Sequence, residues 1–337
     1  MNQESLAKVA SDIVASGRGI LAADESTPTM GKRLALIEQE NTEENRRDFR
    51  QALFDTEGIE DYISGVILFE ETLTQKAKDG TRLSKILEFK GIYPGIKVDK
   101  GAHPMDSSSS EKLTKGLDGL YERCLEYYEQ GARFAKWRAV ITIGDGIPTE
   151  ECIQANASAL AKYAKACQDA ELVPIVEPEV LMDGDHTIET CYEVSEKTLK
   201  ATFKELENEG VYLPGILLKP NMVVSGSECS VQGDMMTVAE MTVKCLTESV
   251  PAEVPGIVFL SGGQSEVEAT EHLNAMNKMG SHPWALSFSY GRALQQSALK
   301  TWNGQKDNLQ STYAVFHHRA EMNSLACSGE YSSSLEI

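Results

Sequence analysis

Three consecutive segments decide the fold: Val173-Pro-Ile-Val-Glu-Pro-Glu179, the stretch from Ile188 to Leu206, and Gly215-Ile-Leu-Leu-Lys219. The first and third segments are short, rich in aliphatic residues and bounded by turn-forming or polar residues, which is typical of buried strands. In the stretch between them, apolar residues recur with the period of one helix face. They are Ile188, Tyr192, Leu199, Phe203 and Leu206. Strand, helix and strand in this order predict two parallel strands joined by a crossover helix.

Runs of the same kind occur eight times along the chain. They are Ile20–Asp24, Ile63–Phe69, Gly95–Asp99, Phe134–Arg138, Val173–Glu179, Gly215–Lys219, Gly256–Ser261 and Ala285–Tyr290. Successive runs begin 29 to 43 residues apart, which leaves room for a strand, two loops and a helix. Helical periodicity also appears from Leu117 to Tyr127 and from Ile153 to Cys167.

Eight strand and helix units without a break in composition predict an α/β fold, a single-domain (β/α)8 TIM barrel over residues 1–327. An open, doubly wound sheet is the alternative. Leu6, Val9, Ala10, Ile13 and Val14 predict an extra helix before the first strand. Residues 328–337 are mostly small and polar, and we expect a flexible C-terminal tail there.

The composition restricts the possible partners and location of the protein. The 337 residues are 41% hydrophobic, which is enough for a large core, and carry a formal net charge of -19. This charge argues against binding to nucleic acid or to an anionic membrane, since both need a basic surface. The longest apolar runs are too short to span a membrane. Seven widely spaced cysteines and the lack of a leader pattern at the N-terminus favour a cytoplasmic location.

Charged side chains stand at the carboxyl ends of the predicted strands, where barrel enzymes build their active sites. Lys136 and Arg138, and likewise Glu177 and Glu179, are two residues apart, so each pair points to one face of its strand. Adjacent strands lie about 4.8 Å apart, which brings these residues and Lys219 within reach of one small molecule. Each pair taken singly is also compatible with a salt-bridged rim.

Lys219 ends a fully apolar strand, in Leu217-Leu-Lys-Pro-Asn221. Burial and a neighbouring cation such as Lys136 both disfavour the protonated amine, and the neutral amine is a nucleophile toward carbonyls. A buried lysine paired with a glutamate for structural reasons is the alternative. We expect Glu177 and Glu179 to supply acid and base, one of them with a pKa raised by burial.

Two loops at the end of the series indicate phosphate binding. Ser261-Gly-Gly-Gln-Ser265 follows the seventh run, and Ser289-Tyr-Gly-Arg292 follows the eighth. Loops at these two positions bind phosphate in many barrels, because glycine N–H groups approach the anion and arginine adds a bidentate contact. The six histidines form no HxxxH pair, and no dinucleotide or P-loop motif occurs, so we expect neither a metal nor a cofactor.

Motifs along nine tenths of the chain resemble those of the class I fructose-1,6-bisphosphate aldolases, which are metal-independent Schiff-base enzymes. The resemblance rests on residues 19–26, 40–47, 95–101, 134–138, 173–179, 217–222, 259–265 and 288–294, which follow the order of the family. It implies a (β/α)8 barrel, a homotetramer, and reversible cleavage of a phosphorylated ketose, fructose 1,6-bisphosphate, in glycolysis and gluconeogenesis. Pro28 and Thr29 stand where the family has a small Gly-Ser pair.

The resemblance also implies residue roles. Lys219 corresponds to the Schiff-base lysine and Glu177 to the principal proton-transfer residue. Asp24, Lys136 and Glu179 complete the centre, with Arg138 in support. One phosphate corresponds to Ser261, Gly262, Gly263, Ser289, Gly291 and Arg292, and the other end of the substrate to Ser26, Arg33, Arg46 and Lys97. Other readings are a Schiff-base aldolase for a different sugar phosphate, or an inactive homologue that binds sugar phosphate or serves as a protein scaffold.

Overall fold

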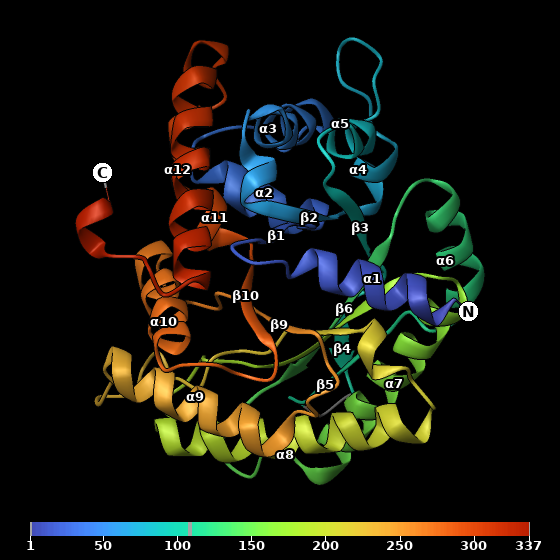
Figure 1. Cartoon of the computed structure of the whole chain (residues 1–337), viewed down its shortest axis with the longest axis vertical. Helices are drawn as coiled ribbons and strands as arrows, with labels where there is room; N and C mark the ends of the chain where they lie inside the picture. Colours follow the sequence, from blue (N-terminus) through green and yellow to red (C-terminus); the bar gives the residue numbers. More distant parts are fainter. Residues whose placement is uncertain (1, 107–109, 337) are drawn as a thin grey trace.

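A computed structural model describes residues 2–106 and 110–336, and within these residues eight parallel strands close into a barrel (Figure 1). The strands, in their order around the barrel, are β1 (Gly19–Ala23), β10 (Ala285–Tyr290), β9 (Gly256–Phe259), β8 (Leu217–Leu218), β7 (Val173–Val180), β6 (Phe134–Ile141), β3 (Tyr93–Lys97) and β2 (Ile63–Leu68). All eight predicted strands are confirmed. The closed order also shows that the alternative, an open sheet, is wrong.

Helices follow each barrel strand and surround the barrel (Figure 1). They are α2 (Thr27–Ala35), α3 (Glu43–Asp55), α4 (Glu70–Thr74), α5 (Leu83–Phe89), α6 (Leu120–Glu129), α7 (Glu150–Asp169), α8 (Ile188–Asn208), α9 (Met235–Ser249), α10 (Glu266–Lys278), α11 (Arg292–Trp302) and α12 (Leu309–Cys327). The three helical stripes found in the sequence correspond to α6, α7 and α8. Leu117 lies before the start of α6.

The amino end of the barrel interior is filled by apolar side chains. Phe134 at the start of β6 is fully buried, and its ring lies where glycines on the neighbouring strands leave room. A methyl side chain at Gly65 or Gly95 would lie 3.0 Å or 2.2 Å from that ring. The two glycines of β2 and β3 are therefore part of the packing around one phenylalanine.

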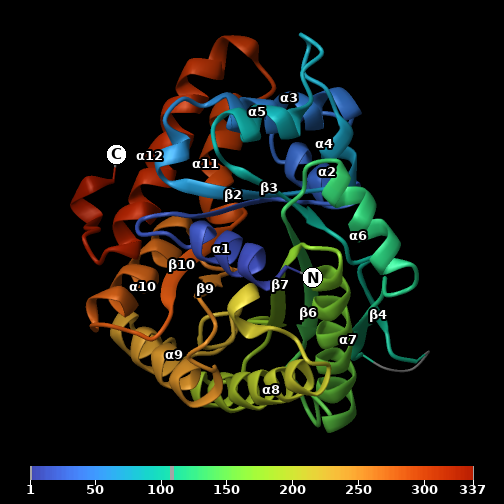
Figure 2. The same cartoon turned by 45° about the vertical axis from the view of Figure 1, so that its right-hand side comes forward.

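Helix α1 (Gln3–Ile13) closes this end of the barrel, and it lies in front of the strands in Figure 1 and in the turned view of Figure 2. A methyl side chain at Gly215, just before β8, would lie 2.9 Å from Leu6, and one at Gly256, the first residue of β9, 2.6 Å from Val14. Ser64 near the start of β2 donates a hydrogen bond to the carbonyl of Ile13. The predicted N-terminal helix is confirmed as an apolar plug.

One feature of the fold differs from the sequence expectation. The segment after β3 contains a hairpin of β4 (Ala102–Pro104) and β5 (Lys112–Thr114), which the sequence analysis did not predict.

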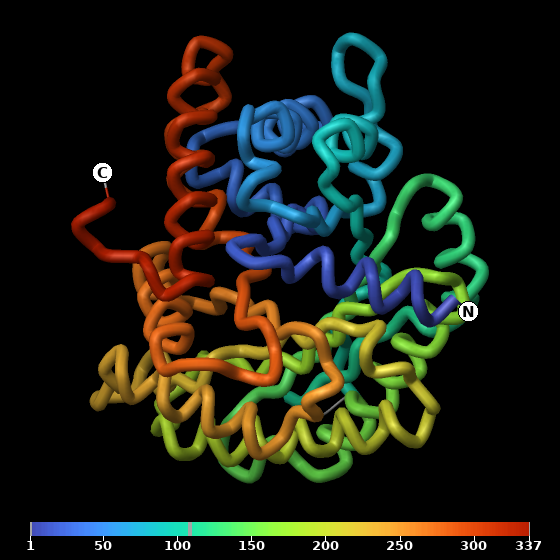
Figure 3. The backbone as a smooth tube through the Cα atoms, viewed as in Figure 1, coloured from blue at the N-terminus to red at the C-terminus, as the bar shows by residue number. Residues whose placement is uncertain are grey.

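The two ends of the chain lie on opposite sides of the molecule (Figure 3). In the described part of the C-terminal segment, Tyr331 is buried and its hydroxyl donates to Glu336 Oε1 at 2.8 Å, while Glu336 is paired with Arg319. Residue 337 lies outside the described residues, and the flexibility of this segment stays a prediction.

Candidate active site

A cavity of about 660 Å³ opens at the carboxyl ends of the strands, opposite α1. Every barrel strand, or the residue or loop directly after it, contributes to its lining. The charged residues that line it are Asp24, Glu25, Arg33, Glu70, Lys97, Asp99, Lys100, Lys136, Arg138, Glu177, Glu179, Lys219 and Arg292. The charges that follow the strands in the sequence therefore converge on one space, as predicted.

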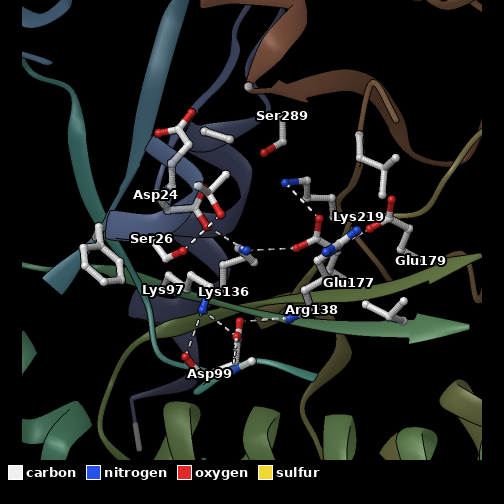
Figure 4. Close-up of a pocket in the computed structure, with 18 of the residues that line it drawn as sticks. Asp24, Ser26, Lys97, Asp99, Lys136, Arg138, Glu177, Glu179, Lys219 and Ser289 are labelled. Carbon is white, nitrogen blue, oxygen red and sulfur yellow. Dashed lines mark hydrogen bonds and ion pairs between the residues drawn. The ribbon is translucent and has the colours of Figure 1, made fainter. Parts of the chain in front are cut away.

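At the centre of the cavity, two lysines and two carboxylates form a chain of ion pairs (Figure 4). Lys136 Nζ lies 2.7 Å from Asp24 Oδ2 and 3.3 Å from Glu177 Oε2. The other oxygen of Glu177 lies 3.1 Å from Lys219 Nζ. The side chains of Lys136, Glu177 and Lys219 are each about 5% exposed, so these ion pairs are almost completely buried.

Strand register explains why these groups meet. Lys97 of β3 pairs with Lys136 of β6, and Arg138 of β6 pairs with Glu177 of β7. The backbone N–H of Lys219 donates to Val176 O, which extends the β7–β8 ladder by one residue. Side chains alternate along a strand, so residues on either side of a core position point into the cavity together. Trp137, between Lys136 and Arg138, faces the helices and stacks on Tyr163 of α7 with ring centroids 5.5 Å apart.

The electrostatics of this cluster keep its carboxylates ionised. Burial raises the pKa of Asp24 and of Glu177, but the nearby cations Lys136 and Lys219 outweigh it, and both pKa values are lowered. Burial alone would lower the pKa of Lys136, but the negative charges of Asp24 and Glu177 raise it by more, so the net shift is upward. Of the two glutamates predicted to supply acid and base, Glu177 is therefore the one that stays ionised. The sequence shows each charge, but not how many cations surround it.

Two further ion pairs flank the centre (Figure 4). Arg138 pairs with Glu179, and Lys97 Nζ lies 2.6 Å from Asp99 Oδ1. Burial lowers the pKa of Arg138, but Glu179 raises it more, and the net shift is upward. All six residues predicted for the catalytic centre therefore line the same cavity.

Sequence reasoning left two buried carboxylates out of the site. Asp99 accepts hydrogen bonds from Lys97 Nζ and from the N–H of Gly101 at 3.1 Å, so it fixes the position of that lysine. Glu25 pairs with Arg33 and accepts a hydrogen bond from Gln295 Nε2 at 3.1 Å. The signal for Asp99 was its spacing of two from Lys97 at a strand end. Glu25 gave no signal, because it follows Asp24 directly and its partners come from distant elements.

The residues predicted for phosphate binding separate into two groups by position. Eight of them line the cavity: Ser26, Arg33, Lys97, Ser261, Gly262, Ser289, Gly291 and Arg292. Gly263 and Arg46 do not line it, and Arg46 is instead paired with Glu71 at 2.7 Å. Thr29, one of the departures from the family pattern, lines the cavity with its hydroxyl oxygen 3.0 Å from that of Ser26.

Arg33 lies closer to the loop after β10 than its predicted group indicates. A methyl side chain at Gly291 would lie 3.6 Å from Arg33 Nη2. Partial burial lowers the pKa of Arg292, and the charge of Arg33 lowers it further, as expected for two arginines near one another. Within the described residues, the buried hydroxyl of Ser289 has no hydrogen-bond partner. Two arginines and a free hydroxyl make this part of the cavity suited to an anionic oxygen ligand.

Two other features are absent from the residues that the structure describes. No group of three or more His, Cys, Asp or Glu side chains there is arranged to hold a metal ion. In residues 2–106 and 110–336, no helix is both long and apolar enough to cross a membrane.

Fold and site together define a class of protein: a barrel enzyme with a buried lysine beside a carboxylate at the carboxyl ends of its strands, an arrangement that suits a Schiff-base aldolase. The model of the family "Fructose-bisphosphate aldolase class-I" matches residues 5–336. A probable fructose-bisphosphate aldolase class 1 of Xanthomonas campestris is 54% identical over 332 residues, which cover 98% of this chain and 99% of the relative. The fructose-bisphosphate aldolase of Dictyostelium discoideum is 52% identical and covers 97% of this chain and 93% of its own.

The solved structures agree with the sequence relatives. A structure of fructose-bisphosphate aldolase from Plasmodium falciparum, in complex with TRAP and a small-molecule inhibitor, has a TM-score of 0.97 and 53% sequence identity. The match covers 98% of this chain and 96% of that one. The chain belongs to the class I fructose-bisphosphate aldolase family, and the family resemblance found in the sequence is confirmed. Its function is that of a lyase, the aldolase of glycolysis.

Proposed function

We propose that Lys219 forms the Schiff base of this aldolase and that Glu177 is its principal proton-transfer residue. The observation that carries the proposal is the 3.1 Å separation of Lys219 Nζ and Glu177 Oε1, between two side chains that are each about 5% exposed. The neutral amine of a lysine can attack a ketone, and an ionised carboxylate in contact with it can take part in proton transfer.

The reaction then proceeds through covalent intermediates on Lys219. The neutral amine of Lys219 adds to the ketone of fructose 1,6-bisphosphate, and the carbinolamine takes up one proton and loses water to leave a protonated imine. Glu177 takes the proton from the hydroxyl of the carbon that departs, the carbon–carbon bond breaks, and its electron pair moves into the imine to give an enamine. Glyceraldehyde 3-phosphate leaves first. Protonation of the enamine and hydrolysis of the imine then release dihydroxyacetone phosphate and the free lysine.

Neighbouring residues orient and stabilise these groups. Lys136 contacts both Asp24 and Glu177, so it holds the two carboxylates in place and stabilises negative charge during proton transfer. Asp24 is positioned to orient a substrate hydroxyl. Glu179 completes the carboxylate set, with Arg138 paired to it in support.

The two ends of the substrate are assigned to two sets of residues. Ser261, Gly262, Gly263, Ser289, Gly291 and Arg292 bind one phosphate, and Ser26, Arg33, Arg46 and Lys97 serve the other end. The free hydroxyl of Ser289 supports the first assignment. The chain carries a net charge of -19. The cations among these residues, which are Arg33, Arg46, Lys97 and Arg292, must therefore make the mouth of the cavity locally positive to attract an anionic substrate.

Assembly and location complete the proposal. The chain forms a homotetramer, the usual assembly implied by the resemblance to the family, and works in the cytoplasm. All seven cysteines are free thiols in the structure, which fits a reducing compartment. The enzyme acts on a phosphorylated ketose and does not bind nucleic acid or a membrane.

A coupled cleavage assay on fructose 1,6-bisphosphate, with and without EDTA, tests this proposal. The protonated imine is the electron sink, so cleavage should proceed at the same rate in both. Activity lost in EDTA and restored by zinc would overturn the Schiff-base assignment. Absence of cleavage in both would favour an inactive homologue that binds sugar phosphate.

A further inference from the structure

The loop between β9 and α10 has an unusual partner. The backbone N–H of Gly263 donates to the thioether sulfur of Met182, with 2.8 Å between N and Sδ. Met182 follows β7 by two residues, so it reaches across the end of β8 to contact a loop two strands away. On the next residue of the loop, the side-chain amide of Gln264 donates to the sulfur of Met222 at 3.7 Å. Two methionines therefore hold this loop.

The glycine is what allows the sulfur to approach. A methyl side chain at Gly263 would lie 2.5 Å from Met182 Sδ, which is closer than real atoms pack. Gly263 does not line the cavity, and its N–H is engaged by the sulfur. Arg292 is engaged in a similar way, because its guanidinium donates to the carbonyl of Gly262. Two groups proposed for phosphate are thus paired within the protein.

The strengths of the competing acceptors differ. A thioether sulfur is a weak acceptor, whereas a phosphate oxygen forms short, charge-assisted hydrogen bonds. Successive glycine N–H groups in a loop can form a concave site for an anion. A phosphate that enters the cavity can therefore take the Gly263 N–H from the sulfur at little cost, while a stronger acceptor at position 182 would retain it.

We propose that Met182 is a positioning residue for the phosphate loop: its thioether holds the Gly263 N–H while the site is empty and releases it to the substrate phosphate. This inference rests on the proposed function, which places Gly263 in the phosphate site. It makes the acceptor strength of residue 182 a determinant of affinity for phosphorylated ketoses. The proposal concerns this contact of Met182, and Met222 serves only to hold Gln264.

A series of variants at position 182 tests the idea. Met182→Leu keeps the apolar volume and removes the acceptor, whereas Met182→Gln supplies a carbonyl oxygen on a side chain of similar length. The readout is the ketone concentration that gives the half-maximal rate of borohydride trapping, with dihydroxyacetone phosphate and with unphosphorylated dihydroxyacetone. Met236→Leu, on the exposed side of α9, is the matched control.

For dihydroxyacetone phosphate, we expect that concentration to be about 5- to 10-fold higher in Met182→Gln than in Met182→Leu, with the unchanged protein between them. For dihydroxyacetone, the variants should agree within about 2-fold. Equal values for the Gln and Leu variants, or equal shifts with both ketones, would overturn the proposal. If Met182→Gln does not fold, Met182→Leu decides by itself. A weaker preference of Met182→Leu than of the unchanged protein for dihydroxyacetone phosphate over dihydroxyacetone would then overturn the proposal. No trapping in the unchanged protein would instead overturn the proposed function.

Discussion

At the amino end of the barrel, Leu6 of α1 packs near Gly215, Val14 directly after this helix packs near Gly256, and the interior behind them is apolar. At the carboxyl end, the same strands place Lys136, Glu177 and Lys219 in contact inside a cavity. Both ends are buried, so burial alone does not mark function. The difference lies in the effect of burial on stability. Burial of apolar groups stabilises the fold, whereas buried charges are tolerated only when they face each other or a ligand.

We expect the two ends to respond differently to substitution. Changes at the amino end should lower the stability of the fold and leave the kinetic constants unchanged. Changes at the carboxyl end should alter the kinetics, and alter stability only where they leave a charge unpaired. Four variants test this separation.

The largest effect is expected for Lys219→Met, which keeps the apolar stem of the side chain and removes the amine. Without a nucleophile there is no imine, so kcat for cleavage of fructose 1,6-bisphosphate should fall by about 10³-fold or more. The assay is the coupled cleavage reaction, with urea unfolding as the control for the fold. Residual activity within about tenfold of the unchanged protein would assign the nucleophile to another residue.

Phe134→Ala tests the opposite end. Removal of the ring that fills the space above Gly65 and Gly95 should lower the free energy of unfolding by about 3–5 kcal/mol. The KM and kcat of the folded fraction should stay within about twofold, since Phe134 does not line the cavity. Urea unfolding and steady-state kinetics at a temperature where the variant is folded give the two values. A large change in kcat would remove the distinction between the two ends.

Lys136→Met should destabilise the protein in a pH-dependent way. The pKa values of Asp24 and Glu177 are lowered in the folded state, so their contribution to stability is present above the unfolded pKa and lost as pH falls through the folded pKa. Without Lys136, burial is less opposed and both values rise. The variant should therefore lose about 3–5 kcal/mol at pH 7, where Asp24 has lost its ion-pair partner and Glu177 keeps only Lys219, and less at pH 4.

Urea unfolding of both proteins at the two pH values measures this change. A loss that is the same at pH 7 and pH 4 would mean that Lys136 does not control the protonation of the two carboxylates.

Arg292→Ala should have the smallest effect of the four. The side chain is exposed at the cavity mouth, so its removal should leave stability within about 0.5 kcal/mol. Loss of a charge-assisted phosphate contact should raise KM for fructose 1,6-bisphosphate by about 10- to 100-fold. An unchanged KM in steady-state kinetics would place the phosphate elsewhere.

The sequence predicted the main elements of both ends of the barrel. All eight strands could be located, because each is an apolar run bounded by glycine, proline or polar residues. The charges at their carboxyl ends could be assigned to one cavity, because parallel strands of a barrel share a direction. Even β8, with only Leu217 and Leu218 in its ladder, was found through its apolar run.

Features that depend on contacts between distant segments were not predicted. The strands of the β4–β5 hairpin have three residues each, too few for a periodic signal. Glu25 is held by Arg33 and Gln295, and Gly263 by Met182, and neither pairing follows from spacing along the chain. The lowered pKa of Glu177 results from the sum of several cations at short range, which only the assembled barrel defines.

The central claim is that Lys219 is the nucleophile, and reductive trapping tests it most directly. The protein is incubated with dihydroxyacetone phosphate and borohydride, digested, and its peptides mapped, with Lys219→Met as the matched control. The account predicts one covalent adduct, on Lys219, and no adduct in the variant. An adduct on Lys136 or Lys97, or no adduct on any lysine, would contradict it.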